Sequence, residues 1–277
     1  MNIWLNGALH DASAIAGGAT VSPLDHGLTT GDGVFETIKI VDGQPFAATR
    51  HLDRLVVSAT GLGLPSPDLA LVRDAIATVV KADPDIAFGR LRITYTGGVS
   101  PLSSDRGTDG PTLIVAAQAI EKPASSSAIV TVPWVRNERS AVAGLKTTSY
   151  AENVRALAYA KERGGSEAIF ANTIGDLCEG TGSNIFCVFD GELVTPTLES
   201  GALSGVTRNL VLAWFGGVER DIPLAKLAEA DEIFLTSTTR DVQAIHRADE
   251  RDLAVPGEVT ATVAKVFAER SADDLDP

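Results

Sequence analysis

The chain has 277 residues, of which 44% are hydrophobic, and its formal net charge is −13 at pH 7. This length exceeds what one compact core needs and suits two domains, each with a core of its own. The negative charge argues against a nucleic-acid-binding surface, which would need a basic patch, although an acidic protein can still contain a local basic pocket.

Membrane segments, disulfides and metal sites are not indicated by the sequence. No uninterrupted apolar stretch is long enough to span a bilayer, and residues 1–7 lack the basic and apolar regions of a signal peptide. We therefore expect a cytoplasmic protein. Cys178 and Cys187 suggest neither a disulfide framework nor a zinc site, because their number and spacing fit neither. Two reduced, packed thiols and no bound metal are expected.

The first half of the chain reads as strands with two helices inserted. Residues 34–41 are rich in β-branched side chains and precede Asp42-Gly43, a turn signal, so we expect a strand there. Hydrophobic spacing predicts two helices and two further strands in this half, over 50–62, 67–82, 89–96 and 112–117.

The composition changes at residues 118–127, which are small, polar and proline-containing. Such a segment suits a linker, so we place a domain boundary there. It separates a smaller N-terminal domain, residues 1–117, from a larger C-terminal domain, residues 128–277. An ordinary surface loop inside one domain fits the composition equally well.

The second half mixes helices and strands too irregularly for a doubly wound sheet. Helices are expected over 151–162, 205–215 and 256–270, and strands over 167–171, 184–189, 192–195 and 232–236. The pair Gly164-Gly165 is expected to end the first of these helices.

Two segments of the second half contain candidate catalytic groups. Residues 144–150 place Lys146 after a small-residue turn, at the start of an expected helix, and residues 179–186 place Glu179 beside a glycine-rich turn. A lysine that bonds the cofactor aldehyde and moves protons, with an acid that keeps the ring nitrogen protonated, is what pyridoxal phosphate needs. The simpler alternatives are a solvated lysine at a helix start and a surface acid at a hairpin turn.

Three further segments suit a phosphate group. Residues 206–207 open an expected helix whose unpaired backbone N–H groups attract anions. Residues 236–239 place four hydroxyls at a strand end, where a turn can form an anion-binding nest. Arg54 lies on an expected helix, and a guanidinium suits a phosphate dianion. The alternatives are a helix start capped by Ser204, a polar strand end, and a solvated arginine paired with Asp53.

Six segments, in this order along nearly the whole chain, together resemble a known family. They are residues 31–37, 51–55, 144–154, 179–186, 204–208 and 235–239. With these motifs the chain resembles the fold-type IV pyridoxal-phosphate enzymes, the class-IV aminotransferase family of branched-chain aminotransferases, D-amino-acid aminotransferases and aminodeoxychorismate lyases. The resemblance implies an α+β fold of two domains, with a smaller N-terminal α/β domain and a larger C-terminal domain of mixed strands in a pseudo-barrel with helices. It also implies a homodimer.

The resemblance assigns roles residue by residue. Lys146 and Glu179 become the catalytic pair, with pyridoxal 5'-phosphate held in a cleft between the domains. The cofactor phosphate is expected to contact Arg54, Val206, Thr207, Ser237 and Thr238. Tyr150 is expected to hydrogen-bond the ring oxygen of the cofactor, although the local spacing differs by one residue from that of related aminotransferases.

The substrate pocket departs from one branch of the family. D-amino-acid aminotransferases carry a tyrosine where this chain has Phe35, and a carboxylate-binding arginine where it has Gly97-Gly98-Val99. Phe35 is expected to line the pocket. Arg90 and Arg92 alternate on one face of a strand, so either is a candidate for a substrate carboxylate or for a salt-bridged outward face.

These residues favour an aminotransferase that moves an amino group between an amino acid and a 2-oxo acid. The alternative within the family is an aminodeoxychorismate lyase, which uses the same lysine and acid to release pyruvate and 4-aminobenzoate. A non-catalytic small-molecule-binding protein on the same scaffold would be expected to have lost the lysine or the acid, and both are present.

Overall fold

The computed structural model describes residues 1–11 and 20–277, which form two compact units. The first unit contains Met1–Lys122, Leu145–Ser149 and Leu275–Pro277, and the second contains Pro123–Gly144 and Tyr150–Asp274. The chain first passes between the units after Lys122, within the segment 118–127 whose composition predicts a linker. Among the described residues, no helix is long and apolar enough to cross a membrane.

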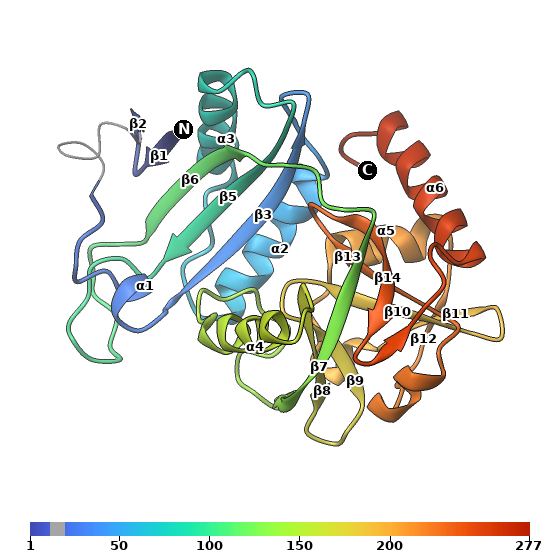
Figure 1. Cartoon of the computed structure of the whole chain (residues 1–277). Coiled ribbons are helices and arrows are strands. Elements are labelled where there is room, and N and C mark those ends of the chain that lie inside the picture. Colours follow the sequence, from blue (N-terminus) through green and yellow to red (C-terminus); the bar gives the residue numbers. More distant parts are fainter. Residues whose placement is uncertain (12–19) are drawn as a thin grey trace. The chain divides into compact units, whose positions relative to one another are not determined.

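The first unit is a six-stranded antiparallel sheet with helices packed on it (Figure 1). Its strands are ordered β2-β1-β6-β5-β3-β4. The elements are β1 Asn2–Leu5, β2 Ala8–Asp11, α1 His26–Thr29, β3 Gly33–Val41, β4 Gln44–Pro45, α2 Ala48–Gly61, α3 Leu69–Ala82, β5 Phe88–Thr96 and β6 Thr112–Ala119.

One face of this sheet forms the core of the unit. Alternate residues of β3, such as Val34 and Ile38, are fully buried and pack against apolar residues of α2 and α3, including Leu55 and Val72. Because successive side chains of a strand point to opposite faces, the residues between them lie on the other face of the sheet. That second face carries Phe35 and its neighbours on β5.

The second unit is built on a nine-stranded mixed sheet, ordered β12-β11-β10-β13-β14-β7-β8-β9, with β15 paired to β14. Its strands are β7 Ser126–Arg136, β8 Glu167–Asn172, β9 Leu177–Gly180, β10 Asn184–Phe189, β11 Glu192–Thr195, β12 Val218–Glu219, β13 Glu232–Ser237, β14 Asp241–Ala248 and β15 Arg251–Asp252. Its helices are α4 Ala151–Glu162, α5 Val206–Trp214 and α6 Glu258–Asp273, with 3-10 turns η2 Leu198–Ser200 and η3 Leu224–Glu229. The α+β fold class expected from the sequence is therefore confirmed.

The expected elements agree with the structure best where the hydrophobic pattern is strong. Helix α4 and strands β10 and β11 have the expected bounds. Gly164 follows the end of α4 with a φ of 75°, a left-handed conformation that glycine adopts without strain. The sequence did not predict β7, which begins inside the expected linker, or β14, to which β7 pairs in parallel.

Candidate active site

Lys146 lies in an extended segment that completes the edge of strand β3. The Lys146 carbonyl accepts a hydrogen bond of 2.9 Å from the Phe35 amide, and Thr147 forms an antiparallel bridge with Val34. The Lys146 amide donates to Ser58 Oγ on α2 at 3.1 Å. Since β4 pairs only with the far end of β3, this segment satisfies backbone groups at an otherwise open strand edge. Strand pairing thus fixes the backbone of Lys146.

The expectation that Lys146 starts a helix is wrong. Helix α4 begins at Ala151, with Tyr150 as its N-cap residue, and residues 145–150 are not helical. The reason is the pairing to β3, which holds the backbone at Thr147 out of the helical region. Tyr150 therefore does not follow Lys146 by one helical turn, and it belongs to the second unit while Lys146 belongs to the first.

The side chain of Lys146 lies over the ring of Phe35, with Nζ 4.4 Å from the ring centroid. Arg92 approaches the same ring, with its guanidinium carbon 3.7 Å from the centroid, and donates a hydrogen bond of 3.1 Å to Thr37 Oγ1. Phe35 is buried. The structure therefore brings together two sequence-predicted residues, Phe35 and Arg92, with the predicted catalytic lysine.

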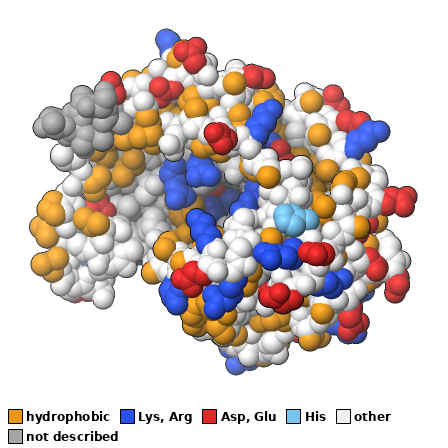
Figure 2. Space-filling view, in the orientation of Figure 1, with side chains coloured by type: hydrophobic (Ala, Val, Ile, Leu, Met, Phe, Trp, Pro, Cys, Tyr) orange, Lys and Arg blue, Asp and Glu red, His pale blue; other side chains and the backbone are white. Residues whose placement is uncertain are grey.

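The face of the sheet around Phe35 is basic. Arg92 is opposite Thr37 and Arg90 is opposite Lys39 in the β3–β5 pairing, so these cations share the face that carries Phe35. Figure 2 shows a group of basic side chains over these strands. Arg90 and Arg92 are both exposed in this chain. A carboxylate approaching Lys146 over this sheet would meet positive charge, in a chain whose net charge is −13.

Arg54 pairs with Glu36 and not with Asp53, the acid that the sequence suggested. Arg54 Nε donates to Glu36 Oε1 at 2.8 Å, and Nη2 donates to Oε2 at 2.8 Å. His51 Nδ1 lies 2.7 Å from the same Oε2. Glu36 is fully buried on the helix-covered face of β3. The bidentate pairing fixes the plane of the Arg54 guanidinium against the sheet.

The charges in this cluster are shifted by burial and by one another. Burial acts to raise the pKa of Glu36, but the charge and hydrogen bonds of Arg54, with the contact of His51, outweigh it and hold that pKa far below 4.5. Burial is the main cause that holds the pKa of His51 below 6.5. Glu36 acts to raise that pKa, and the positive charges of Arg54 and Lys146 lower it further. Glu36 is therefore ionised and His51 neutral near pH 7.

In the second unit, Glu179 lies on strand β9, so it is not a surface acid at a hairpin turn. Its Oε2 accepts a hydrogen bond of 2.9 Å from the Leu203 amide, and its Oε1 lies 3.4 Å from Arg136 Nε. That distance is one of an ion pair, since Arg136 Nε has no hydrogen-bond partner. The Arg136 guanidinium also stacks on Phe170 at 4.4 Å and bonds Glu152 at 2.6 Å. Arg136 is a positioning group that the sequence analysis missed.

Leu203 connects Glu179 to the two predicted phosphate-binding segments. While its amide binds Glu179, its carbonyl accepts a hydrogen bond of 2.8 Å from Asn184 Nδ2. Asn184 pairs with Thr236 in the ladder between β10 and β13, and its side chain adjoins Gly205 at the start of α5. Within the second unit, Leu203 and Asn184 thus connect Glu179 with the first turn of α5 and the end of β13.

The start of helix α5 has the donors that a phosphate needs. Its N-cap residue is Gly205, and the Oγ of the preceding Ser204 accepts a hydrogen bond of 2.9 Å from Asn209 Nδ2. A Cβ on Gly205 would lie 1.9 Å from Asn184 Oδ1, so a larger residue there would displace the Asn184 side chain. Val206 and Thr207 form the first turn, and the buried hydroxyl of Thr236 nearby has no partner. These donors fit a phosphate dianion.

Ser237 and Thr238 follow directly at the end of β13, where the Arg240 amide closes a turn on the Ser237 carbonyl at 3.2 Å. Arg240 in turn forms an ion pair of 2.7 Å with the buried Glu167. Glu167 also accepts hydrogen bonds from Thr181 Oγ1 and the Gly182 amide, at 2.8 and 2.6 Å. The glycine-rich turn after Glu179 is therefore packed on Glu167. The sequence signals the Arg240–Glu167 pair only through Glu167, a charged residue at the start of an apolar strand.

The two cysteines behave as the sequence predicts. Both are free and buried, and burial raises the pKa of each thiol to about 12. In the described part of the chain, no group of three or more His, Cys, Asp or Glu side chains is arranged to hold a metal ion.

Comparisons with known proteins point to one family. Residues 33–248 match the model of the family described as amino-transferase class IV. The chain is 33% identical over 281 residues to a putative branched-chain-amino-acid aminotransferase of Methanocaldococcus jannaschii, with 96% of this chain and 95% of the relative covered. It is 29% identical over 264 residues to a bifunctional aminodeoxychorismate lyase / D-amino acid transaminase of Mycobacterium tuberculosis, with 86% and 88% covered.

Solved structures give the same result. A branched-chain aminotransferase of Thermoproteus uzoniensis, solved with norvaline, superposes with a TM-score of 0.90 at 30% identity, covering 97% of this chain and 94% of that one. A hypothetical aminotransferase of Mycobacterium tuberculosis in a PLP-bound form superposes with a TM-score of 0.87 at 25% identity, covering 99% and 100%.

Proposed function

The chain belongs to the amino-transferase class IV family, and we propose that it moves an amino group between an amino acid and a 2-oxo acid with pyridoxal 5'-phosphate as its cofactor. When bound, this cofactor supplies an aldehyde that takes up the amino group and a ring that accepts electrons. The proposal is supported by the family's chemistry and by a related structure in a PLP-bound form. The observation that carries it is the placement of Lys146 Nζ over Phe35, on a basic sheet face.

In this proposal Lys146 is the base of the reaction. Its Nζ would hold the cofactor, and as a free amine it would take a proton from the substrate α-carbon and return it. Backbone pairing holds the Lys146 main chain beside β3, from which Nζ reaches over Phe35. Arg92 receives the substrate carboxylate because it shares the Phe35 ring with Lys146, while Arg90, two residues earlier on the same face, adds charge that attracts anions.

Glu179 and the phosphate-binding residues hold the cofactor in the proposed site. The carboxylate of Glu179 keeps the ring nitrogen protonated, and Arg136 with the Leu203 amide keeps that carboxylate in one orientation. The phosphate is bound by Arg54 and by donors at two chain turns, namely Val206, Thr207, Ser237 and Thr238. Tyr150 is proposed to hydrogen-bond the ring oxygen.

An absorbance titration tests this function. Purified protein loaded with pyridoxal 5'-phosphate is mixed with a panel of L- and D-amino acids, and conversion of the aldehyde form to the amine form is followed. We expect at least one amino acid to convert the aldehyde form and a 2-oxo acid to reverse the change. In Lys146→Ala, the amino acid should not produce the amine form. A protein that binds the cofactor but is converted by no amino acid would contradict an aminotransferase.

A second function is favoured by one relative, the bifunctional aminodeoxychorismate lyase / D-amino acid transaminase. A lyase needs the same base and acid, and the basic sheet face suits the carboxylates of aminodeoxychorismate. The two activities are separated by products. Release of pyruvate from aminodeoxychorismate would indicate the lyase, whereas formation of glutamate from an amino acid and 2-oxoglutarate would indicate the aminotransferase.

We also propose that the protein is a cytoplasmic homodimer, as the family resemblance implies. Sedimentation velocity measures this directly: a single species of twice the 28.9 kDa chain mass is expected. A monomer at micromolar concentration would contradict the dimer without affecting the proposed reaction.

A further inference from the structure

Helix α2 carries both His51 and Arg54, and it begins without a cap of its own. Its N-cap residue is Ala47, whose φ of 53° is left-handed and whose side chain has no hydrogen-bonding group. The first N–H groups of a helix have no partner within the helix, and an N-cap side chain usually satisfies one of them. Here the local sequence supplies no such side chain.

The missing cap comes from Leu275–Pro277, a segment that follows directly on the last residue of the second unit but packs in the first. Asp276 Oδ1 accepts a hydrogen bond of 2.7 Å from the Thr49 amide, and Oδ2 accepts one of 2.6 Å from Thr49 Oγ1. The Leu275 carbonyl accepts from the Ala47 amide at 2.6 Å. A carboxylate at this position also complements the positive end of the helix dipole.

A series of hydrogen bonds connects these contacts to the Arg54 side chain. The Ala47 amide is bound by Leu275, and the Ala47 carbonyl accepts the first helical hydrogen bond, from the His51 amide at 3.2 Å. The His51 ring contacts Glu36, which accepts two hydrogen bonds from Arg54. The first turn of α2 therefore links the docked segment to the orientation of the guanidinium.

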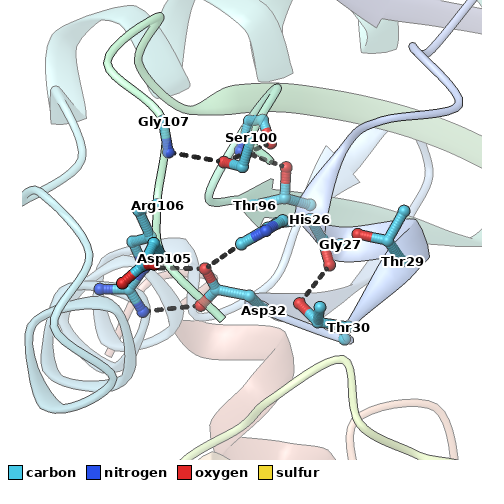
Figure 3. A network of polar contacts seen from close by, with 12 residues as sticks. His26, Gly27, Thr29, Thr30, Asp32, Thr96, Ser100, Asp105, Arg106 and Gly107 are labelled. Carbon is cyan, nitrogen blue, oxygen red and sulfur yellow. Dashed lines mark hydrogen bonds and ion pairs between the residues drawn. The ribbon is translucent and has the colours of Figure 1, made fainter. Parts of the chain in front are cut away.

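The other end of α2 is held in a similar way. Arg106 donates from Nη2 to the Leu62 carbonyl at 2.9 Å and from Nη1 to the Gly63 carbonyl at 2.5 Å. The guanidinium is fixed by two hydrogen bonds of 2.7 Å to Asp32, which also lies 3.4 Å from His26 (Figure 3). Since Arg106 holds the two residues that follow the last turn of α2, the first turn is the end of the helix whose order depends on Asp276.

We propose that Asp276 is a positioning residue for Arg54, acting as the N-cap of α2 from a segment far away in sequence, so that docking of this segment and binding of a phosphate at Arg54 strengthen each other. The inference rests on the proposed function for the identity of the phosphate, which is that of pyridoxal 5'-phosphate. Coupling of two binding equilibria is reciprocal, so the phosphate must also stabilise the docked segment.

The test uses three variants of the full chain. Asp276→Ala removes the cap, Asp276→Asn keeps an acceptor for the Thr49 amide, and Asp273→Ala removes an exposed acid of the same region as a control. Affinity is measured for pyridoxal 5'-phosphate and, separately, for pyridoxal, which lacks the phosphate. Amide hydrogen exchange over residues 48–54 and over α3 is measured without cofactor.

We expect Asp276→Ala to weaken pyridoxal 5'-phosphate binding about 3- to 10-fold, within the range for a lost N-cap, and to leave pyridoxal binding unchanged. Exchange over 48–54 should rise about 3- to 10-fold, and α3 should not change. Asp276→Asn should show only a small part of either change, because it keeps the acceptor. Asp273→Ala should behave as wild type.

Unchanged exchange over 48–54 in Asp276→Ala would overturn the inference, as would an equal loss of affinity for both ligands, which a merely structural role predicts. Wild-type protein that binds neither ligand would overturn the proposed function instead. In that case the exchange measurement, repeated with and without inorganic phosphate, would still decide whether Asp276 orders the helix segment that carries Arg54.

Discussion

Arg54 and Glu36 are joined by two hydrogen bonds of 2.8 Å each, from Nε to Oε1 and from Nη2 to Oε2. The carboxylate is fully buried and the arginine nearly so, at 0% and 11% side-chain exposure. A pair in this setting costs desolvation to form, but removal of one partner leaves a buried charge without compensation. Arg54, the proposed phosphate ligand, is thus held by Glu36, a buried acid whose charge would be left uncompensated without it.

Arg54→Met should therefore lower the free energy of unfolding of cofactor-free protein by about 3–5 kcal/mol, measured by urea denaturation. The double variant Arg54→Met with Glu36→Gln should recover part of this loss, because no charge is then left buried. Arg90→Met, at an exposed position, serves as the control and should change stability by less than about 0.5 kcal/mol. A loss below about 1 kcal/mol in Arg54→Met would show that the pair is solvated.

The same cluster predicts how stability depends on pH. The folded-state pKa of His51 lies below 6.5, and that of Glu36 lies below 4.5. Each group therefore binds fewer protons when folded than when unfolded. The stability they contribute is present above those values and is lost as pH falls, first for His51 and then for Glu36.

We expect the unfolding free energy of wild type to fall between pH 6.5 and pH 5, with His51 contributing at most about 1.4 kcal/mol per pH unit. His51→Gln should show a smaller slope over this interval. Denaturant midpoints at a series of pH values measure it. A variant with the same slope as wild type would mean that His51 titrates normally.

Arg92 and Arg90 offer a matched comparison on one strand. Both face the same side of the sheet, but the structure places only Arg92 against Phe35. If Arg92 receives the substrate carboxylate, Arg92→Ala should raise KM about 10- to 100-fold, as expected for a hydrogen bond to a charged group. Arg90→Ala should raise it much less. Equal effects of the two substitutions would indicate that both arginines attract the substrate through long-range charge, and that Arg92 does not contact its carboxylate.

Glu179→Gln separates mechanism from binding. Glutamine keeps the acceptor for the Leu203 amide but removes the charge that we propose keeps the ring nitrogen protonated. The chemical step measured by stopped flow should slow on the order of 10²–10³-fold, with little change in cofactor occupancy. Glu152→Gln is the control, because it removes the other carboxylate paired with Arg136. A near-normal half-reaction in Glu179→Gln would show that this acid only shapes its strand.

Much of the fold could be predicted from the sequence, because periodicity and glycine positions are local signals. Helix α4 and strand β10 followed from their patterns alone. Strand β7 did not, since Pro133 interrupts its ladder and the pairing register shifts between Thr131 and Val135. Its parallel partners are distant in sequence, so nothing local indicated it.

The site could be predicted only in part, for a related reason. Lys146 and Glu179 were found as residue types in suitable segments. The extended backbone at Lys146 was missed because it depends on pairing with Val34, more than a hundred residues earlier. Glu36 lies within the motif of residues 31–37, and an acid at a core-facing strand position already requires a buried partner. Its partner, Arg54, is visible only in three dimensions.

The measurement that tests the account most directly is the position of the covalent bond to the cofactor. Protein incubated with pyridoxal 5'-phosphate is reduced with borohydride, digested, and the modified peptide is identified by mass spectrometry. We predict a single major adduct on Lys146, which should be absent from Lys146→Ala. Lys39, which lies on the same sheet face, should remain unmodified. Labelling of another lysine in the wild type, or no labelling of any, would contradict the assignment of Lys146 and with it the proposed reaction.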